Sequence, residues 1–137
     1  MHEVFEHTAD LGLRIQNTSL EKLLEEAGIA LFELLVVNLH KVQPRVTKHL
    51  TLEQKENDLL LFDWLNELLF QFEVEKLVFS KFHIERQDTV FSAVLSGEPL
   101  DASRHQLDHE VKAITYHGLK VEQLSCSEWL AEVILDI

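Results

Sequence analysis

Residues 18–35 read TSLEKLLEEAGIALFELL, an amphipathic run with no proline. Its apolar residues return at spacings of three and four positions, which is the period of a helix with one buried face. They are Leu20, Leu23, Leu24, Ala27, Leu31, Leu34 and Leu35. Thr18 and Glu21 have the spacing of a capping box at the helix start, and Pro44 prevents the helix from continuing past it. The run therefore predicts a long helix that packs against a second apolar layer.

A second helix and a series of strands follow from the same kind of pattern. Asn57 suits an N-cap position, and the apolar stripe behind it predicts a helix that ends at about Glu73. Other apolar runs, bounded by turn residues, predict strands over 4–5, 11–15, 46–52, 77–84, 90–95, 111–116, 119–124 and 129–135. We predict an α+β fold in which two long helices pack on a mainly antiparallel sheet of about seven strands. The length of 137 residues predicts a single domain over residues 1–137.

The charge of the chain argues against direct nucleic-acid binding. Twelve Lys and Arg side chains stand against 24 Asp and Glu, a net charge of -12 that is spread along the whole sequence. Phosphates are repelled by such a surface, and no cluster of basic residues interrupts it. A basic protein partner or a bound cation is favoured instead.

The expected compartment follows from the cysteine content and the hydropathy. Cys126 is the only cysteine, so no internal disulfide can form, and a lone thiol suits a reducing environment. No apolar run approaches the roughly 18 residues of a membrane span, and the first ten residues are acidic where a signal peptide is basic. We therefore expect a cytoplasmic protein with no membrane partner.

Two acidic residues near the ends of the chain are candidate metal ligands. Asp10 and Asp136 each end an otherwise apolar, strand-like segment. If these terminal strands pair, two carboxylates and nearby main-chain carbonyls would form an all-oxygen site, which suits a hard cation such as calcium. The four glycines are too widely spaced for a phosphate-binding loop, so an autonomous nucleotide site is not indicated.

Two further groups of ionisable residues have both a structural and a functional interpretation. His105 and His109 have the spacing of two zinc ligands on a helix, but a polar loop whose histidines bond to backbone or water is the favoured interpretation. Asp63 and Glu67 lie one helical turn apart and could share a cation or a proton. Paired acids on an outward helix face are more often only solvated, which is favoured here.

Four stretches, taken together and in order, resemble the archease family over essentially the whole chain. They are residues 7–12 (HTADLG), 63–69 (DWLNELL), 111–117 (VKAITYH) and 136–137 (DI). The resemblance implies a protein that is not itself an enzyme but activates an RtcB-type tRNA-splicing ligase, which joins RNA ends bearing a 3′-phosphate or 2′,3′-cyclic phosphate to 5′-hydroxyl ends. Such activators promote guanylylation of the ligase and its multiple turnover, in tRNA splicing or RNA repair. RNA is then contacted only indirectly, through the ligase.

The resemblance also implies a calcium site formed by Asp10, Asp136 and a main-chain oxygen of Ile137, with magnesium or another divalent cation as the alternative occupant. Further residues in the similar stretches are candidates of second rank. They are His7, Asp63, Glu67, Lys112 and His117.

Two other functional classes compete with the activator. A metal-dependent hydrolase would use Asp10 and Asp136 to activate water and would turn over without a partner. A chaperone-like interaction module would bind client proteins through its acidic surface and would not depend on the metal ligands.

Overall fold

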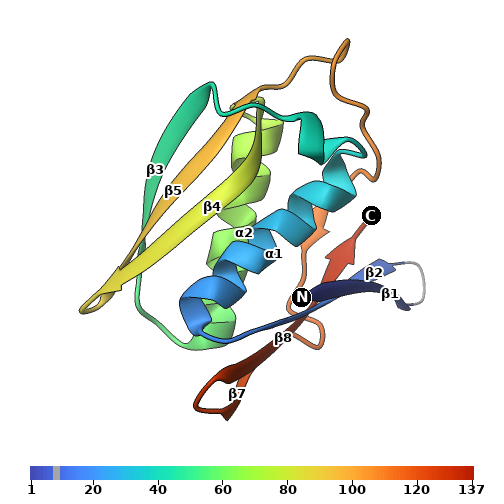
Figure 1. Cartoon of the computed structure of the whole chain (residues 1–137). Coiled ribbons are helices and arrows are strands. Elements are labelled where there is room, and N and C mark those ends of the chain that lie inside the picture. Colours follow the sequence, from blue (N-terminus) through green and yellow to red (C-terminus); the bar gives the residue numbers. More distant parts are fainter. Residues whose placement is uncertain (8–9) are drawn as a thin grey trace.

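The computed structural model describes residues 1–7 and 10–137, and this part of the chain folds into two α-helices and eight strands (Figure 1). The elements are β1 (His2–His7), β2 (Asp10–Asn17), α1 (Leu20–Leu35), a 3₁₀ turn (Leu39–Lys41), β3 (Val46–Glu53), α2 (Asn57–Glu73), β4 (Leu77–Gln87), β5 (Val90–Pro99), β6 (Ala113–Ile114), β7 (Lys120–Ser125) and β8 (Glu128–Asp136). The polar segment 7–10 separates the predicted strands at 4–5 and 11–15 and is expected to form a turn or strand end, but its residues Thr8 and Ala9 lie outside the described residues. No described helix is long and apolar enough to cross a bilayer.

The strands form two sheets, and every recorded pairing is antiparallel. One sheet has the order β1-β2-β8-β6, with β7 also paired to β8, and the other has the order β3-β5-β4. The predicted α+β class, the two helices and the antiparallel pairing are confirmed. The number of strands is eight instead of about seven, and they are divided between two sheets.

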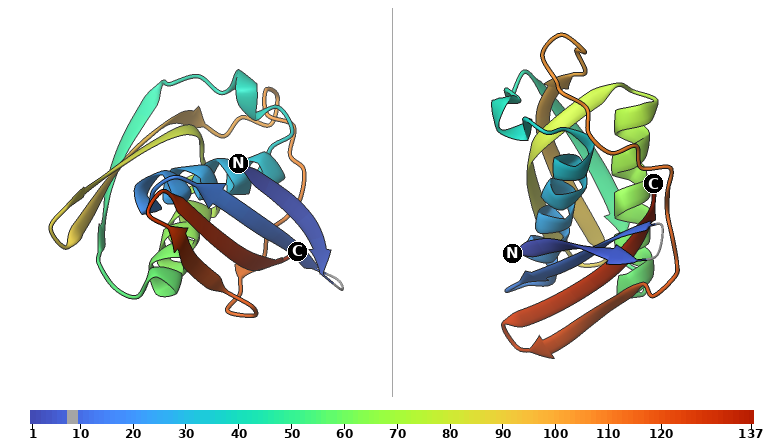
Figure 2. Two further views of the ribbon diagram at one scale, coloured as in Figure 1. Left: turned by 60° about the horizontal axis from the view of Figure 1, so that its bottom comes forward. Right: turned by 90° about the vertical axis from the view of Figure 1, so that its right-hand side faces the viewer.

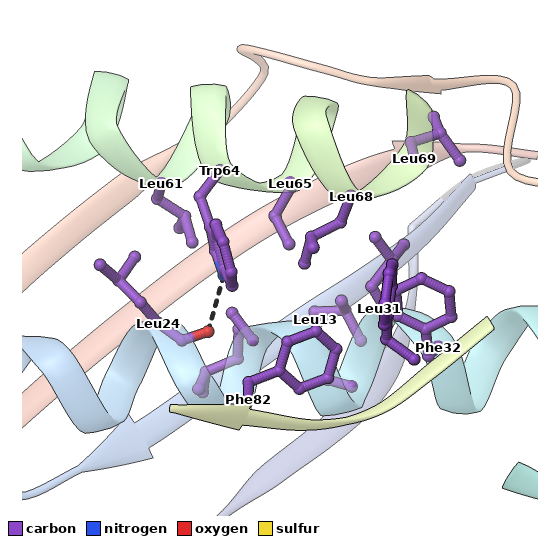
Figure 3. Packing of buried hydrophobic residues seen from close by; sticks show 14 of the residues in the cluster. Leu13, Leu24, Leu31, Phe32, Leu61, Trp64, Leu65, Leu68, Leu69 and Phe82 are labelled. Atoms are coloured by element: carbon purple, nitrogen blue, oxygen red, sulfur yellow. Dashed lines mark hydrogen bonds between the residues drawn. The ribbon is translucent and has the colours of Figure 1, made fainter. Parts of the chain in front are cut away.

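The helices lie between the two sheets, and both contribute buried residues to the core (Figure 2). Helix α1 contacts β4 of the smaller sheet and β2 of the larger one, which explains why its apolar stripe is wide. Phe32 and Trp64 are fully buried, and the indole Nε1 of Trp64 donates a hydrogen bond to the carbonyl of Leu24 at 2.8 Å. Figure 3 shows this bond, which joins α2 to α1 inside the apolar cluster. Such buried indole groups need a partner, because an unpaired N–H is costly in an apolar core.

Both helix starts differ by one residue from the prediction. Ser19 is the N-cap of α1, and its hydroxyl accepts a hydrogen bond from the main-chain N–H of Lys22 at 3.1 Å. Thr18, which was predicted to cap this helix, lies one position too early. Asn57 is the first helical residue of α2, and Glu56 occupies the cap position without a side-chain hydrogen bond. Adjacent polar residues compete for a cap, and the choice depends on where the preceding strand ends.

The predicted strand at 111–116 is mostly wrong, because only Ala113–Ile114 pairs with β8. The long connection before it runs back along the end of α1. The side chain of Asn38 donates to the carbonyl of Arg104 and accepts from the N–H of Gln106. The main-chain groups of this connection thus form their hydrogen bonds within a loop and not with a neighbouring strand. Its apolar residues therefore need not alternate between two faces of a sheet.

Candidate functional site

Strands β2 and β8 of the larger sheet bring Asp10 and Asp136 to neighbouring positions. β2 pairs antiparallel with β8, and the last registered pair is Leu11 opposite Leu135. Asp10 begins β2 and Asp136 ends β8, so each lies one position beyond this pair. Residues that face each other across an antiparallel pair have Cβ atoms about 4.5–5.5 Å apart. The pairing of terminal segments that the metal hypothesis requires is therefore present, and both side chains are half-buried.

Two other strands and a turn converge on the same end of this sheet. His7, the last residue of β1, is registered opposite Asp10. Its ring lies 5.1 Å, centroid to centroid, from that of His117, at an angle of 55°. The main-chain N–H of Lys112 donates to the carbonyl of Asp136 at 2.7 Å, while the Lys112 side chain is exposed. The tertiary structure thus gathers Asp10, Asp136, His7, His117 and the backbone of Lys112 from β1, β2, β8 and the stretch 111–117.

The chemistry of these groups suits a cation whose shell is completed by main-chain oxygens and water. Two carboxylates and carbonyl oxygens are ligands that hard cations prefer, and calcium needs six to eight of them. Nδ1 of His7 is buried and has no hydrogen-bond partner among the described residues, so this atom is available to a water or ligand in the site. Among residues 1–7 and 10–137, no group of three or more His, Cys, Asp or Glu side chains has the arrangement of a metal centre. Side chains alone therefore do not form a complete shell, and the ligand set with Ile137 stays a prediction.

Asp63 and Glu67 lie at a different place on the molecule. They line a cavity of about 610 Å³ between α2 and β3, which none of the residues around Asp10 lines. Asp63 forms an ion pair with Lys55, and Glu67 accepts a hydrogen bond from Nε2 of Gln71 at 3.0 Å. The structure thus divides the predicted candidates into two groups, one at the sheet end and one along α2.

A buried ionic cluster in the connection after β5 was not predicted. Glu98 and His105 are only 2% and 3% exposed. The N–H of Asp101 donates to Nδ1 of His105 at 2.9 Å, so Nε2 carries the proton that is donated to Oε1 of Glu98 at 2.7 Å. Arg104 lies 3.0 Å from Oε1 of Glu98, and Arg45 lies 3.6 Å from Oε2. This cluster anchors the connection to the end of β5.

The same cluster decides between the two interpretations of His105 and His109. His105 is in a loop and both of its ring nitrogens are already bonded, one of them to a backbone N–H. His109 is 40% exposed and lies 3.9 Å from Asp108. The loop position of both histidines is confirmed, and a pair of zinc ligands on one helix is not formed. The expected partners are only partly correct, because Nε2 of His105 bonds to the Glu98 carboxylate and not to backbone or water. Spacing in the sequence had related His105 to His109, but gave no signal for Glu98, which is seven residues away in a strand.

Because of this cluster, the stability of the folded protein should depend on pH in the acid range. Burial works against a charged Glu98, but the hydrogen bond from His105 and the positive charge of Arg104 outweigh it and hold the pKa of Glu98 below its ordinary value of 4.5. A carboxyl with a lowered pKa in the folded state stabilises the fold above its unfolded pKa, and this contribution is lost as the pH falls through the folded value. We expect the wild type to be more stable than Glu98→Gln near neutral pH, with a difference that shrinks below pH 4.5. Urea denaturation of both proteins from neutral to about pH 3 measures this difference.

The exposed Glu75 provides the control for this measurement. Glu75→Gln should differ little from the wild type at any pH in the series, since surface charges contribute little to stability. A gap between wild type and Glu98→Gln that stays constant over the whole pH range would contradict the role assigned to the Glu98 carboxylate.

Comparisons with known proteins extend over nearly the full length of the chain. The model of the Archease protein family (MTH1598/TM1083) matches residues 2–137. Protein archease of Pyrococcus abyssi is 39% identical over 139 residues, which cover 98% of this chain and 97% of the relative. Protein archease of Methanopyrus kandleri is 38% identical over 141 residues, with 98% of each chain covered.

Two solved structures share the fold. The solution structure of Methanobacterium thermoautotrophicum protein 1598 superimposes with a TM-score of 0.84 at 31% identity, over 99% of this chain and 98% of the other. The crystal structure of a Thermotoga maritima archease, described as a possible chaperone, gives a TM-score of 0.71 at 25% identity, over 100% and 98%.

Proposed function

The chain belongs to the archease family, and on that premise we propose that it is a calcium-binding accessory protein that activates an RtcB-type RNA ligase. In this role it promotes guanylylation and multiple turnover of the ligase in tRNA splicing or RNA repair, and it catalyses no reaction itself. It acts in the cytoplasm.

One observation carries the proposal: Asp10 and Asp136 each lie one position beyond the last registered β2–β8 pair, Leu11 with Leu135, at one end of the sheet. Their carboxylates, with a main-chain oxygen of Ile137, would hold the cation, while His7 and His117 border the same end. A bound divalent cation would supply positive charge at a surface that is otherwise strongly acidic. Both carboxylates are half-buried. They are therefore less screened by water than exposed carboxylates and attract a cation more strongly.

The charge of the chain supports a partner of the opposite sign. A net charge of -12 repels RNA phosphates, but it favours association with a ligase that binds RNA through a basic surface. An accessory protein of this kind would approach the positively charged part of the ligase and present the Asp10 end of its sheet to it.

The proposal is tested with Asp10→Ala in a ligase assay. The variant is expected to leave guanylylation and multiple-turnover joining at the ligase's own basal level, because one of the two carboxylates that hold the cation is lost. Calcium-depleted buffer should have the same effect on the wild-type protein, and restored calcium should rescue the wild type but not the variant.

Asp88→Asn is the matched control for this experiment. Asp88 lies at the β4–β5 turn with a positive φ of 57°, a conformation that asparagine adopts readily, so the same charge is removed far from Asp10 without strain. This variant should stimulate the ligase like the wild type. Stimulation that survives Asp10→Ala would favour the chaperone-like alternative, whereas turnover of RNA without any ligase would favour the hydrolase.

A further inference from the structure

Strand β3 leaves one edge of the smaller sheet open. It pairs over its whole length, Val46 to Glu53, with β5, and no strand within residues 1–7 and 10–137 pairs with its other side (Figure 1). Its register with β5 shows no shift. An open, regular edge of this length presents unpaired backbone groups and is a template for another extended chain.

The register shows which backbone groups are available. Gln54 follows β3 and Thr89 precedes β5, so the two residues extend the β3–β5 ladder by one pair. The N–H of Gln54 donates to the carbonyl of Thr89 at 2.7 Å. Because hydrogen-bonded pairs alternate along an antiparallel ladder, Leu52 and Leu50 also bond to β5. Thr51 and His49 therefore direct their N–H and C=O groups to the open edge. Among the described residues, no recorded hydrogen bond reaches these groups.

The opposite edge of the same sheet is protected. Strand β4 has a register shift between Phe79 and Lys81, and a bulge of this kind interrupts pairing. The N–H of Ile84 donates to a carboxylate oxygen of Glu25 at 2.8 Å, so a side chain occupies this edge. The openness of β3 is thus a local property and not a general feature of the sheet.

The cavity of about 610 Å³ runs along the open edge of β3. It is lined by four consecutive residues, 49–52, whose side chains point alternately to the two faces of the sheet. Side chains from both faces of a strand come together at its margin, and the other margin of β3 is covered by β5. This lining therefore indicates that the cavity follows the open edge.

The far wall of the cavity comes from one stripe of α2. Asp63, Asn66, Glu67 and Phe70 line it at spacings of three, four and seven residues, so they lie on one helix face. Phe70 is 45% exposed and offers apolar surface, while Asp63 and Glu67 add two negative charges. The pair between Asp63 and Lys55 is exposed on both sides, with side chains 41% and 42% accessible, and such pairs are weak enough to be exchanged for another cation.

We propose that this groove, formed by the open edge of β3 and the stripe 63–70 of α2, binds an extended segment of a partner protein that carries Lys or Arg. The segment adds a strand to β3 through the backbone groups of His49 and Thr51. Alternate side chains then point toward α2, where an arginine stem lies on Phe70 and its guanidinium reaches Asp63 or Glu67.

The charge of the groove favours a basic segment over a second copy of this chain as the strand that pairs with β3. A second copy of the chain would bring another molecule of net charge -12 and a second pair of acids to the same place, which is repulsive. A basic segment removes the repulsion and gains the acids as partners. The groove is distinct from the Asp10 end, so the inference goes beyond the proposed ligase activation and does not depend on a bound metal.

The binding test is an NMR titration of the full chain with a blocked peptide of about six residues that alternates arginine and valine. Shift changes are expected over 47–53 and the groove face of α2. A glutamate-for-arginine peptide, and an arginine peptide with alternate amides methylated, should both fail to bind. No saturable shift change at millimolar arginine peptide, equal binding of either control peptide, or shift changes elsewhere would overturn the proposal.

Two variants separate the contributions of charge and backbone. Asp63→Asn with Glu67→Gln should weaken binding about fivefold, since two exposed ion pairs are lost. Thr51→Pro removes an outward N–H while leaving the bonds to β5, which is the position that proline tolerates on an edge strand, and should weaken binding about tenfold. Wild-type affinity in either variant, both shown to be folded by their amide spectra, would refute the geometry.

Glu73→Gln with Glu75→Gln removes the same charge outside the groove and should bind like the wild type, as should Asp10→Ala. Asp10→Ala lacks one carboxylate of the proposed metal site, so it should lose ligase stimulation and still bind the peptide. The two proposals can therefore fail independently. A dimer of the free chain that forms through β3, detected by sedimentation, would assign the edge to a second copy and overturn the basic-segment proposal.

Discussion

Replacing Trp64 by alanine is expected to lower the free energy of unfolding by about 3–5 kcal/mol. The indole is fully buried, its ring packs edge-on against Phe82 at a centroid distance of 6.0 Å, and Nε1 donates to Leu24 at 2.8 Å. The substitution therefore leaves a cavity between α1, α2 and β4 and removes a hydrogen bond between the helices. Because domains of this size are stable by only about 5–15 kcal/mol, the loss should be evident as a large shift of the urea midpoint.

Phe70→Ala is the matched control, since it removes an aromatic side chain from the same helix at a position that is 45% exposed. Its expected cost is below about 1 kcal/mol. Trp64→Phe should fall between the two alanine variants, because it keeps most of the buried area but loses the indole N–H. Equal losses for Trp64→Ala and Phe70→Ala would show that the core is not centred where the structure places it.

Replacing Gly97 by alanine is expected to cost about 3 kcal/mol. A Cβ atom at this position of β5 would collide with the carbonyl oxygen of Val78 and lie 2.8 Å from Cα of Phe79. These obstacles are backbone atoms of the neighbouring strand, which cannot rotate away, so β4 and β5 would have to separate beside the bulge. Thermal and urea unfolding of the variant measure this cost.

Gly12→Ala provides the comparison for Gly97. Its added Cβ would also collide with a neighbour, but that neighbour is the ring of Phe5, a half-buried side chain that can change its rotamer. The expected loss is therefore smaller than for Gly97→Ala. A Gly12 variant that is as unstable as the Gly97 variant would mean that the distinction between backbone and side-chain obstacles does not hold here.

Features that depend on neighbouring residues could be predicted, and those that depend on strand pairing could not. The run 18–35 carries its own helical period, so α1 was predicted with its buried face, and only the cap moved from Thr18 to Ser19. Nothing in an alternating pattern states which strands pair, so the division into two sheets was missed. The apolar residues of 111–116 looked like a strand, but only Ala113–Ile114 has a partner.

The candidate sites divide in the same way. Asp10 and Asp136 were chosen because each ended an apolar strand, and this hypothesis depended on a pairing of the two ends that β2 and β8 do form. Binding of calcium there stays a prediction. Glu98 was missed because the residues that bind its carboxylate, His105 and Arg104, lie in a later loop. The groove was missed because its walls come from both β3 and α2.

By itself, the sequence determined the helix periods, the α+β class, the acidity that disfavours RNA, and the stretches that resemble archease. These properties are set by composition and by contacts within a few residues, which a linear pattern records. The tertiary structure alone decided that β3 has an open edge beside Asp63 and Glu67, that Glu98 is buried with His105, and that Asp10 and Asp136 lie at the same end of the β2–β8 pair. Each of these joins residues far apart in the chain, and such contacts exist only after the apolar faces of α1 and α2 have been buried between the two sheets.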